Sequence, residues 1–261
     1  MPFTLAHPAA IIPISKQFRG RVSLSGLVIG SMTPDAVYFL PLGINGRTSH
    51  SLPALVWFCI PVGMAAYVVF HSFVKRPAAA LLPAPVHSRL SPHLLGGPWF
   101  GSVSPGKVMV SVFIGALTHV GWDAFTHAHT GVVATFDFLR MTIGTIGSYR
   151  LPLYKLLQHA SSLAGLLALA LWAHKWFVGA RPVQPATEED GLSQAVRVAV
   201  IAAILGSGIA AGIARGASTA YRAVEHIVVQ ATVGGMIGAG VAGIVFCLGW
   251  HIYMARRSRY A

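Results

Sequence analysis

Long apolar stretches alternate along the chain with short polar connections. Six of them predict helices of membrane-spanning length, since a helix needs about 20 apolar residues to cross a bilayer. They cover residues 22–40, 52–74, 108–130, 151–177, 198–214 and 226–254. Pro34 interrupts the first stretch, and residues 3–14 add a shorter apolar segment that could enter the membrane as a re-entrant hairpin. We therefore predict an all-α fold, a polytopic transmembrane helical bundle with about six spans.

The connections suggest how the chain is divided. Residues 78–106 are rich in proline, glycine and serine, which predicts a loop. Residues 181–192 form a polar linker with an acidic triplet. We expect a helical membrane domain over 1–180 and a pair of transmembrane helices rich in glycine and alanine over 193–261. Glycines at four-residue intervals in this pair let helix backbones approach closely in lipid; they are Gly208, Gly212 and Gly216.

Composition supports a membrane protein. The 261 residues are 54% hydrophobic and only 10% charged, whereas a soluble domain carries roughly 25% charged residues. The formal net charge of +12 would suit nucleic acid. The basic residues, however, lie in the connections between apolar stretches, as membrane topology requires, so we expect no nucleic-acid partner. Oligomeric state stays open.

The distribution of lysine and arginine orients the spans. Most of the 19 basic residues lie at the two termini and in the connections around 75–107 and 178–197, which predicts that these parts face the cytoplasm. A minority falls on the opposite side: Arg47, Arg140, Arg150, Lys155, Arg215 and Arg222. Of these we take Arg140 and Arg150, with Arg222, as candidates for binding an anionic substrate group. They could equally be ordinary interfacial residues.

Residues 115–131, "GALTHVGWDAFTHAHTG", place ionisable side chains inside an apolar stretch. His119 and Asp123 are four residues apart and share one helix face, and His127 lies about one turn further on. A charged residue inside a span costs about 2.5–3.5 kcal/mol, and a bound metal would offset that cost. Imidazole and carboxylate are ligands of zinc and similar divalent ions. The same residues could also form a structural hydrogen bond or a proton relay.

Further ligand-type residues occur in three other apolar blocks. Asp35 follows Pro34 in "GSMTPDAVYFL", His50 lies in "GRTSHS" and His159 in "LPLYKLLQHASS". The predicted topology places these on the same non-cytoplasmic side as the His119 helix face. His7, in "MPFTLAHPAA", would join them only if its segment enters the membrane. The candidate ligands are therefore His7, Asp35, His50, His119, Asp123, His127 and His159.

Four blocks together, covering nearly the whole chain, resemble a bacterial membrane protein family of unknown function. They are "MPFTLAHPAAIIP", "LVIGSMTPDAVYFL", "GALTHVGWDAFTH" and "LPLYKLLQHASSLAG". That family is similar to inner-membrane proteins regarded as metal-dependent hydrolases, which show an early His, a Pro-Asp block, a Thr-His-Ser block and a His-x-x-x-Asp helix. The matching positions here are His7, Pro34 with Asp35, Ser49 with His50, and His119 with Asp123. The third block departs from the pattern, because it reads "TSHS". The resemblance implies a multi-pass protein of the bacterial inner membrane.

The order of the ligands also resembles, more distantly, the soluble zinc-dependent phospholipases C. Their closing His-x-x-x-Glu is missing, because the residue four after His159 is Leu163. The resemblance implies one or two divalent ions, with zinc expected, and either Asp35 or Asp123 bridging them or acting as catalytic base. It further implies hydrolysis of a phosphoester or lipid-linked substrate at the bilayer. The alternative is an ion- or proton-coupled transporter that uses the same residues.

Overall fold

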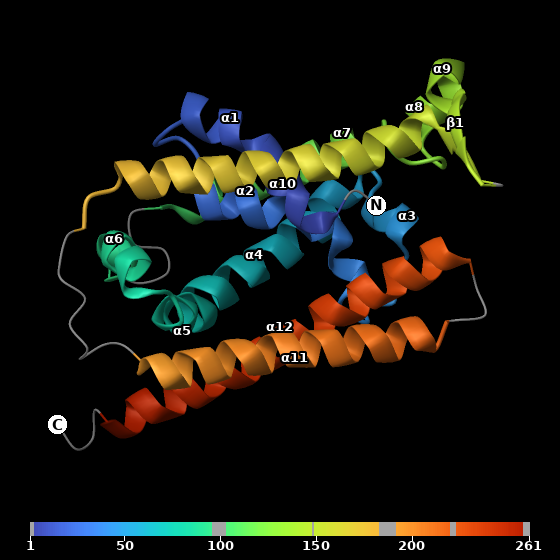
Figure 1. The fold of residues 1–261 in the computed structure, drawn as a ribbon. Coiled ribbons are helices and arrows are strands. Elements are labelled where there is room, and N and C mark those ends of the chain that lie inside the picture. Colours follow the sequence, from blue (N-terminus) through green and yellow to red (C-terminus); the bar gives the residue numbers. More distant parts are fainter. Residues whose placement is uncertain (1–2, 96–102, 148, 183–191, 220–222, 258–261) are drawn as a thin grey trace. The chain divides into compact units, whose positions relative to one another are not determined.

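The computed structural model describes residues 3–95, 103–147, 149–182, 192–219 and 223–257 (Figure 1). Along these residues the chain is helical apart from one two-stranded hairpin, so the helical class predicted from the sequence is confirmed. The contacts divide it into two compact units, one of Met1–Tyr67 with Phe100–Gly179 and one of Val68–Trp99 with Ala180–Ala261. Most of the predicted linker, residues 183–191, lies outside the described residues.

The first unit combines short helices with two long ones (Figure 1). Its helical elements are η1 (Thr4–Ala10), α1 (Ile11–Gln17), α2 (Leu24–Gly30), η2 (Thr33–Tyr38), α3 (Gly46–Ser49), η3 (Leu55–Cys59), α4 (Ile60–Val69), α7 (Pro105–Asp123), α8 (Gly131–Thr135), α9 (Asp137–Arg140) and α10 (Leu153–Gly179). Strands β1 (Thr142–Ile146) and β2 (Tyr149–Pro152) form an antiparallel hairpin before α10.

Helix α7 is the centre of the first unit, and α2 packs directly against it. Two glycines allow this contact. A Cβ on Gly115 would collide with the backbone oxygen of Leu27, and a Cβ on Gly30 would collide with the backbone of Val112. The backbones of α2 and α7 therefore touch. This close approach brings the segment that follows α2 against the last turns of α7.

The N-terminal segment η1 packs mainly against α10, which is far from it in sequence. The Phe3 backbone N–H donates to Ser162 Oγ at 3.0 Å. A Cβ on Gly165 would come within 3.0 Å of the Ala6 carbonyl oxygen. A glycine in α10 thus lets η1 lie close to the helix, which fixes the position of His7.

The second unit contains η4 (Phe70–Val74), α5 (Lys75–Ala80), α6 (Ala84–Leu95), α11 (Gln194–Ala217) and α12 (Val224–Arg257). Helices α11 and α12 lie antiparallel and side by side (Figure 1), and Gly208, Gly212 and Gly216 all face α12. The four-residue spacing of these glycines predicts such a close approach of helix backbones. Helix α6 corrects the expectation of a loop over 78–106 for residues 84–95, whereas residues 96–102 lie outside the described residues. Pro85, at the second position of α6, is compatible with a helix start.

Within the described ranges, four helices are long and apolar enough to cross a membrane: Leu55–Ala80, which runs from η3 to α5, and α10, α11 and α12. They correspond to the second, fourth, fifth and sixth predicted spans. The six-span count is not confirmed. The first predicted span is divided into α2 and η2 around Pro34, and the third becomes α7, which ends at Asp123.

Candidate metal centre

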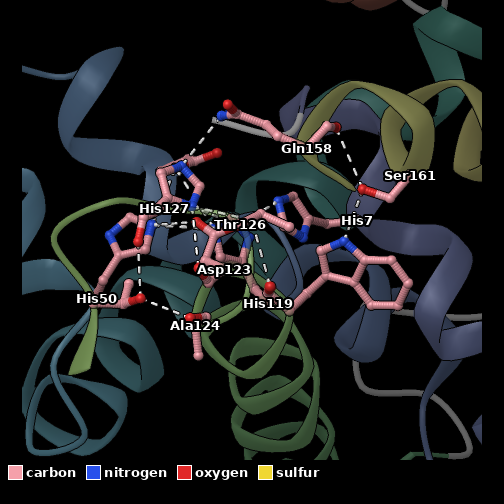
Figure 2. A network of polar contacts seen from close by, with 12 residues as sticks. His7, His50, His119, Asp123, Ala124, Thr126, His127, Gln158 and Ser161 are labelled. Atoms are coloured by element: carbon pink, nitrogen blue, oxygen red, sulfur yellow. Dashed lines mark hydrogen bonds and ion pairs between the residues drawn. The ribbon is translucent and has the colours of Figure 1, made fainter. Parts of the chain in front are cut away.

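Five of the predicted ligands meet in the first unit, although they come from separate parts of the chain. Asp35 and His119 are fully buried, and His7 and Asp123 each expose only 5% of their surface. His50 is half-buried. Figure 2 shows the rings of His7, His50 and His119 gathered around Asp123. Charged and polar groups this deeply buried need partners, because burial without compensation is costly.

Local structure explains how each ligand is presented. Pro34 stands at the start of η2 and directly precedes Asp35. Asn45 caps α3 by accepting from the Thr48 backbone N–H at 2.9 Å, which places His50 just beyond the end of that helix. His119 and Asp123 occupy one face of the last turn of α7, as their spacing predicts.

Four donor atoms form a compact group: Nε2 of His50, Nε2 of His119, Oδ1 of Asp35 and Oδ2 of Asp123. The two nitrogens lie 3.2 Å apart. The His50 nitrogen is 3.4 Å from each of the two carboxylate oxygens. The His119 nitrogen is 3.6 Å from the Asp35 oxygen and 3.4 Å from the Asp123 oxygen. In tetrahedral zinc sites with ligand bonds of about 2.0–2.1 Å, neighbouring ligand atoms lie about 3.3–3.4 Å apart. These five contacts are close to the edge lengths of such a site.

The outer nitrogens of both rings are held by backbone carbonyls. His119 Nδ1 lies 2.7 Å from the Ser31 oxygen, and His50 Nδ1 lies 2.8 Å from the Gly46 oxygen. A carbonyl only accepts hydrogen bonds, so each Nδ1 carries the proton and donates it. Each Nε2 then presents a lone pair to the other and to the carboxylates. Such an arrangement requires a proton or a cation between the lone pairs, and it is how metal-binding histidines are oriented.

Asp35 is oriented in the same way. The Thr4 hydroxyl donates to its Oδ2 at 2.6 Å, which leaves Oδ1 facing the two histidines. That Oδ1 is buried without a hydrogen-bond partner, as are His7 Nε2 and Asp123 Oδ1. Leaving such atoms unpaired costs about 1–3 kcal/mol each. Asp35 Oδ1 faces His50 and His119, whereas His7 Nε2 and Asp123 Oδ1 face each other. Unpaired ligand-type atoms of this kind fit a bound cation.

The two oxygens of Asp123 face different partners. While Oδ2 belongs to the four-atom group, Oδ1 lies 3.5 Å from His7 Nε2 and 3.6 Å from His127 Nδ1. The His7 ring stacks on the His119 ring with centroids 3.6 Å apart. Two overlapping groups could therefore hold a metal, one of His7, His119 and Asp123 and the other of Asp35, His50 and His119. Asp123 can bridge two ions, or His7 can serve as a further ligand of one.

His127 contacts this centre differently. Its Nδ1 lies 3.2 Å from the backbone oxygen of Asp123, so this nitrogen donates a hydrogen bond rather than presenting a lone pair. Its Nε2 lies 3.5 Å from the side-chain nitrogen of Gln158. His127 therefore contacts Asp123 through the backbone and lies outside the donor group. Gln158 in turn contacts His127.

Burial and charge set the protonation of the histidines. Burial lowers the pKa of His7 to about 3 and that of His127 to about 4, so both are neutral at pH 7. Burial also acts to lower the pKa of His50, but its contacts with Asp123 and Asp35 outweigh this and raise it to about 9. His50 thus holds a proton that a metal ion would displace.

A polar pocket of about 230 Å³ opens beside the centre. Its lining includes Asp123 and His50 together with Tyr38, Arg47 and His129. Burial raises the pKa of Tyr38 to about 12, which keeps its hydroxyl protonated. Sequence reasoning missed Tyr38 and Arg47 as site residues, although Arg47 stands only three residues before His50 and so had a local signal.

The other predicted site residues lie outside the donor group. His159 is exposed on α10, whereas its neighbour Gln158 is buried and contacts the site. Arg140 is exposed in α9 and pairs with Asp137. Arg150 is exposed on β2, opposite Thr145 of β1. Arg222 lies outside the described residues.

Comparisons with known proteins supply a family but no activity. No curated protein and no solved structure matches the chain, so its likeness to metal-dependent hydrolases stays a prediction from the motifs. A family model described as "Domain of unknown function (DUF4184)" matches residues 1–248. Because this match covers nearly the whole length, the chain belongs to that family.

Proposed function

We propose that this protein is an integral membrane hydrolase that depends on zinc held by Asp35, His50, His119 and Asp123, with His7 as a further ligand. The observation that carries the proposal is the four-atom donor group. Its five contacts of 3.2–3.6 Å are close to the edge lengths of a tetrahedral zinc site. The histidines donate hydrogen bonds to the Ser31 and Gly46 carbonyls, and the Thr4 hydroxyl donates to Asp35. These contacts orient the ligands, as expected of a metal centre.

A divalent ion bound here would lower the pKa of a water ligand toward 7 and so supply hydroxide at neutral pH. Asp123 is the better candidate for the catalytic base, since it lines the pocket and its Oδ1 has no hydrogen bond. Asp35 is fully buried, and Thr4 occupies one of its oxygens. His127 would hold Asp123 in place through the backbone carbonyl.

The pocket supports an anionic substrate, and we propose a phosphoester. Arg47 offers a planar set of donors that suits a phosphoryl group, and the protonated Tyr38 adds a hydroxyl donor. Four candidate spans support a membrane location. Six spans, a bacterial inner membrane and a site on its non-cytoplasmic side belong to the same proposal and follow from the charge distribution and the motif resemblance.

Elemental analysis of detergent-purified protein tests the centre directly. We expect stoichiometric zinc in the wild type and its loss in His119→Ala and Asp123→Ala. His159→Ala is a matched control, because this histidine is exposed on α10 outside the donor group, and it should keep the metal. Thermal unfolding of each variant would establish that the fold persists.

A wild type that contains no metal after purification without chelator would overturn the hydrolase proposal. Proton-coupled transport through the same buried carboxylates and histidines would then be the next hypothesis, tested by flux in sealed vesicles. If metal is present, cleavage of bis(p-nitrophenyl) phosphate, lost in both ligand variants, is the expected first activity.

A further inference from the structure

A second cavity lies against the metal ligands and differs in character from the polar pocket. It is a groove of about 430 Å³ between η1 and α10. Small apolar side chains form most of its walls, and Trp122 of α7 contributes an aromatic surface. The wall residues that matter here are Ala6, Ala9 and Ala10 on one side and Ala164 and Ala168 on the other.

His7 connects this groove to the metal centre. It lines the groove, exposes only 5% of its surface, and its Nε2 has no hydrogen-bond partner. The same Nε2 lies 3.5 Å from Asp123 Oδ1. One end of the apolar groove therefore stands at a ligand of the centre. Asp123 and His50, in turn, line the polar pocket.

The contacts around the groove keep it open and apolar. The Trp122 indole N–H donates to Ser161 Oγ at 3.1 Å (Figure 2 labels Ser161), so two polar groups of the groove wall satisfy each other. The Phe3 backbone N–H is bound to Ser162, which fixes η1 beside α10. Between these two attachments alanine side chains form most of the walls, and His7, Trp122, Ser161 and Gly165 complete the lining.

The exposure of helix α10 indicates which environment surrounds the groove. It is a candidate span, and only 6% of its apolar window is buried within the protein. Most of its surface would therefore face the hydrocarbon of a bilayer. In a bilayer, a groove along such a helix would lie next to the acyl chains of the surrounding lipids.

We propose that this groove binds an acyl chain of a glycerophospholipid substrate while its phosphoester lies at the metal centre beside Arg47. The inference rests on the proposed function and names its substrate class. The headgroup would occupy the polar pocket, and the tail would run past His7 along α10. A soluble phosphoester would fill only the first of these sites.

Photocrosslinking tests the tail site without relying on catalysis. The probe is phosphatidylglycerol with a diazirine near the end of one acyl chain, added to detergent-purified wild type. Peptide mass spectrometry should locate the crosslinks in η1 and in residues 160–168 of α10. Ala168→Trp should remove them because the indole would fill the groove, and Ala168→Leu should reduce them. Ala170→Trp is the matched control, since Ala170 is exposed on α10 and does not line the groove.

Activity then separates this inference from the proposed function. Ala168→Trp should lower cleavage of phosphatidylglycerol relative to bis(p-nitrophenyl) phosphate by at least several-fold, while Ala170→Trp keeps the wild-type ratio. Crosslinks that persist in Ala168→Trp, or that map elsewhere, would overturn the tail site. Stronger competition by a polyprenyl phosphate than by phosphatidylglycerol would overturn the acyl assignment. Correct crosslinking without cleavage of either substrate would leave the tail site standing and remove the hydrolase.

Discussion

The two units use glycine for the same purpose and then differ in what they bury. In the second unit the buried positions of α11 and α12 are Gly208, Gly212, Gly216, Val233, Gly234 and Cys247. In the first unit Gly30 and Gly115 likewise bring two backbones into contact, but the ends of these elements carry buried aspartates and histidines. Close helix packing alone does not require ionisable groups. The difference therefore points to function in the first unit and to scaffold in the second.

Of the substitutions considered, Asp123→Asn in the first unit should have the largest effect on zinc content and activity. The substitution keeps the shape but removes the charge that faces His7, His50 and His119. We expect zinc content to fall to background and phosphodiester cleavage to be lost. Asp137→Asn is the matched control, because that carboxylate is exposed and pairs only with Arg140 among the described residues. Full metal content in Asp123→Asn would mean that the centre does not depend on this residue.

Two glycine-to-alanine changes compare the units directly. In Gly115→Ala the new methyl group would collide with Leu27, and in Gly212→Ala it would lie 2.9 Å from the Ala231 oxygen. Overpacking of this kind costs about 1–3 kcal/mol, so both variants should melt at lower temperature. Only Gly115→Ala should also lose zinc, because it displaces α2 and the Ser31 carbonyl. Equal zinc content in the two variants would contradict the functional difference between the units.

Thr4→Val should weaken the centre without abolishing it. The Thr4 hydroxyl is the donor that holds Asp35 Oδ2, and loss of such an outer contact typically lowers metal affinity about 10–100-fold. Competition with a zinc chelator would measure the change in Kd. Thr4→Ser retains the hydroxyl and should recover most of the affinity. An unchanged Kd in the valine variant would show that Asp35 is positioned by other means.

The smallest effect concerns pH. His50 has its pKa raised from 6.5 to about 9 in the metal-free protein. Its ion pairs therefore stabilise that form fully below pH 6.5, and this contribution is lost as the pH rises through about 9. Zinc must displace the same proton, so its affinity should increase over this range. We expect the Tm of chelator-treated protein to fall between pH 6.5 and 9, and His50→Gln to flatten the curve. A pH-independent Tm in the wild type would count against a protonated His50.

Spacing within one helix could be predicted from the sequence, and contacts between helices could not. His119 and Asp123 share a face because they are four residues apart on α7. The position of His7 depends on how η1 packs against α10, and nothing near residue 7 encodes that packing. This is why His7 stayed ambiguous and Gln158 was overlooked in favour of His159.

For the fold, too, local features could be predicted from the sequence and contacts between distant segments could not. The longest apolar stretches became helices at nearly the predicted bounds, since length and hydropathy are local properties. The stretch around Pro34 was expected as one span, but the proline divides it, and the resulting turn is what brings Asp35 to the centre. Residues 78–106 contain α6, whose Pro85 lies in the first turn, where proline is tolerated. Pro92 lies further along the same helix, where this reason does not apply.

The attachment of Phe3 to Ser162 has a consequence for biosynthesis. The two residues are 159 positions apart, so a ribosome must have made most of α10 before the N-terminal segment can dock. His7 therefore reaches the other ligands only late in translation, after α7 has been completed. The nascent chain therefore cannot assemble the full donor set before α10 has emerged, and on the proposed function cation binding by the full set would wait for that step.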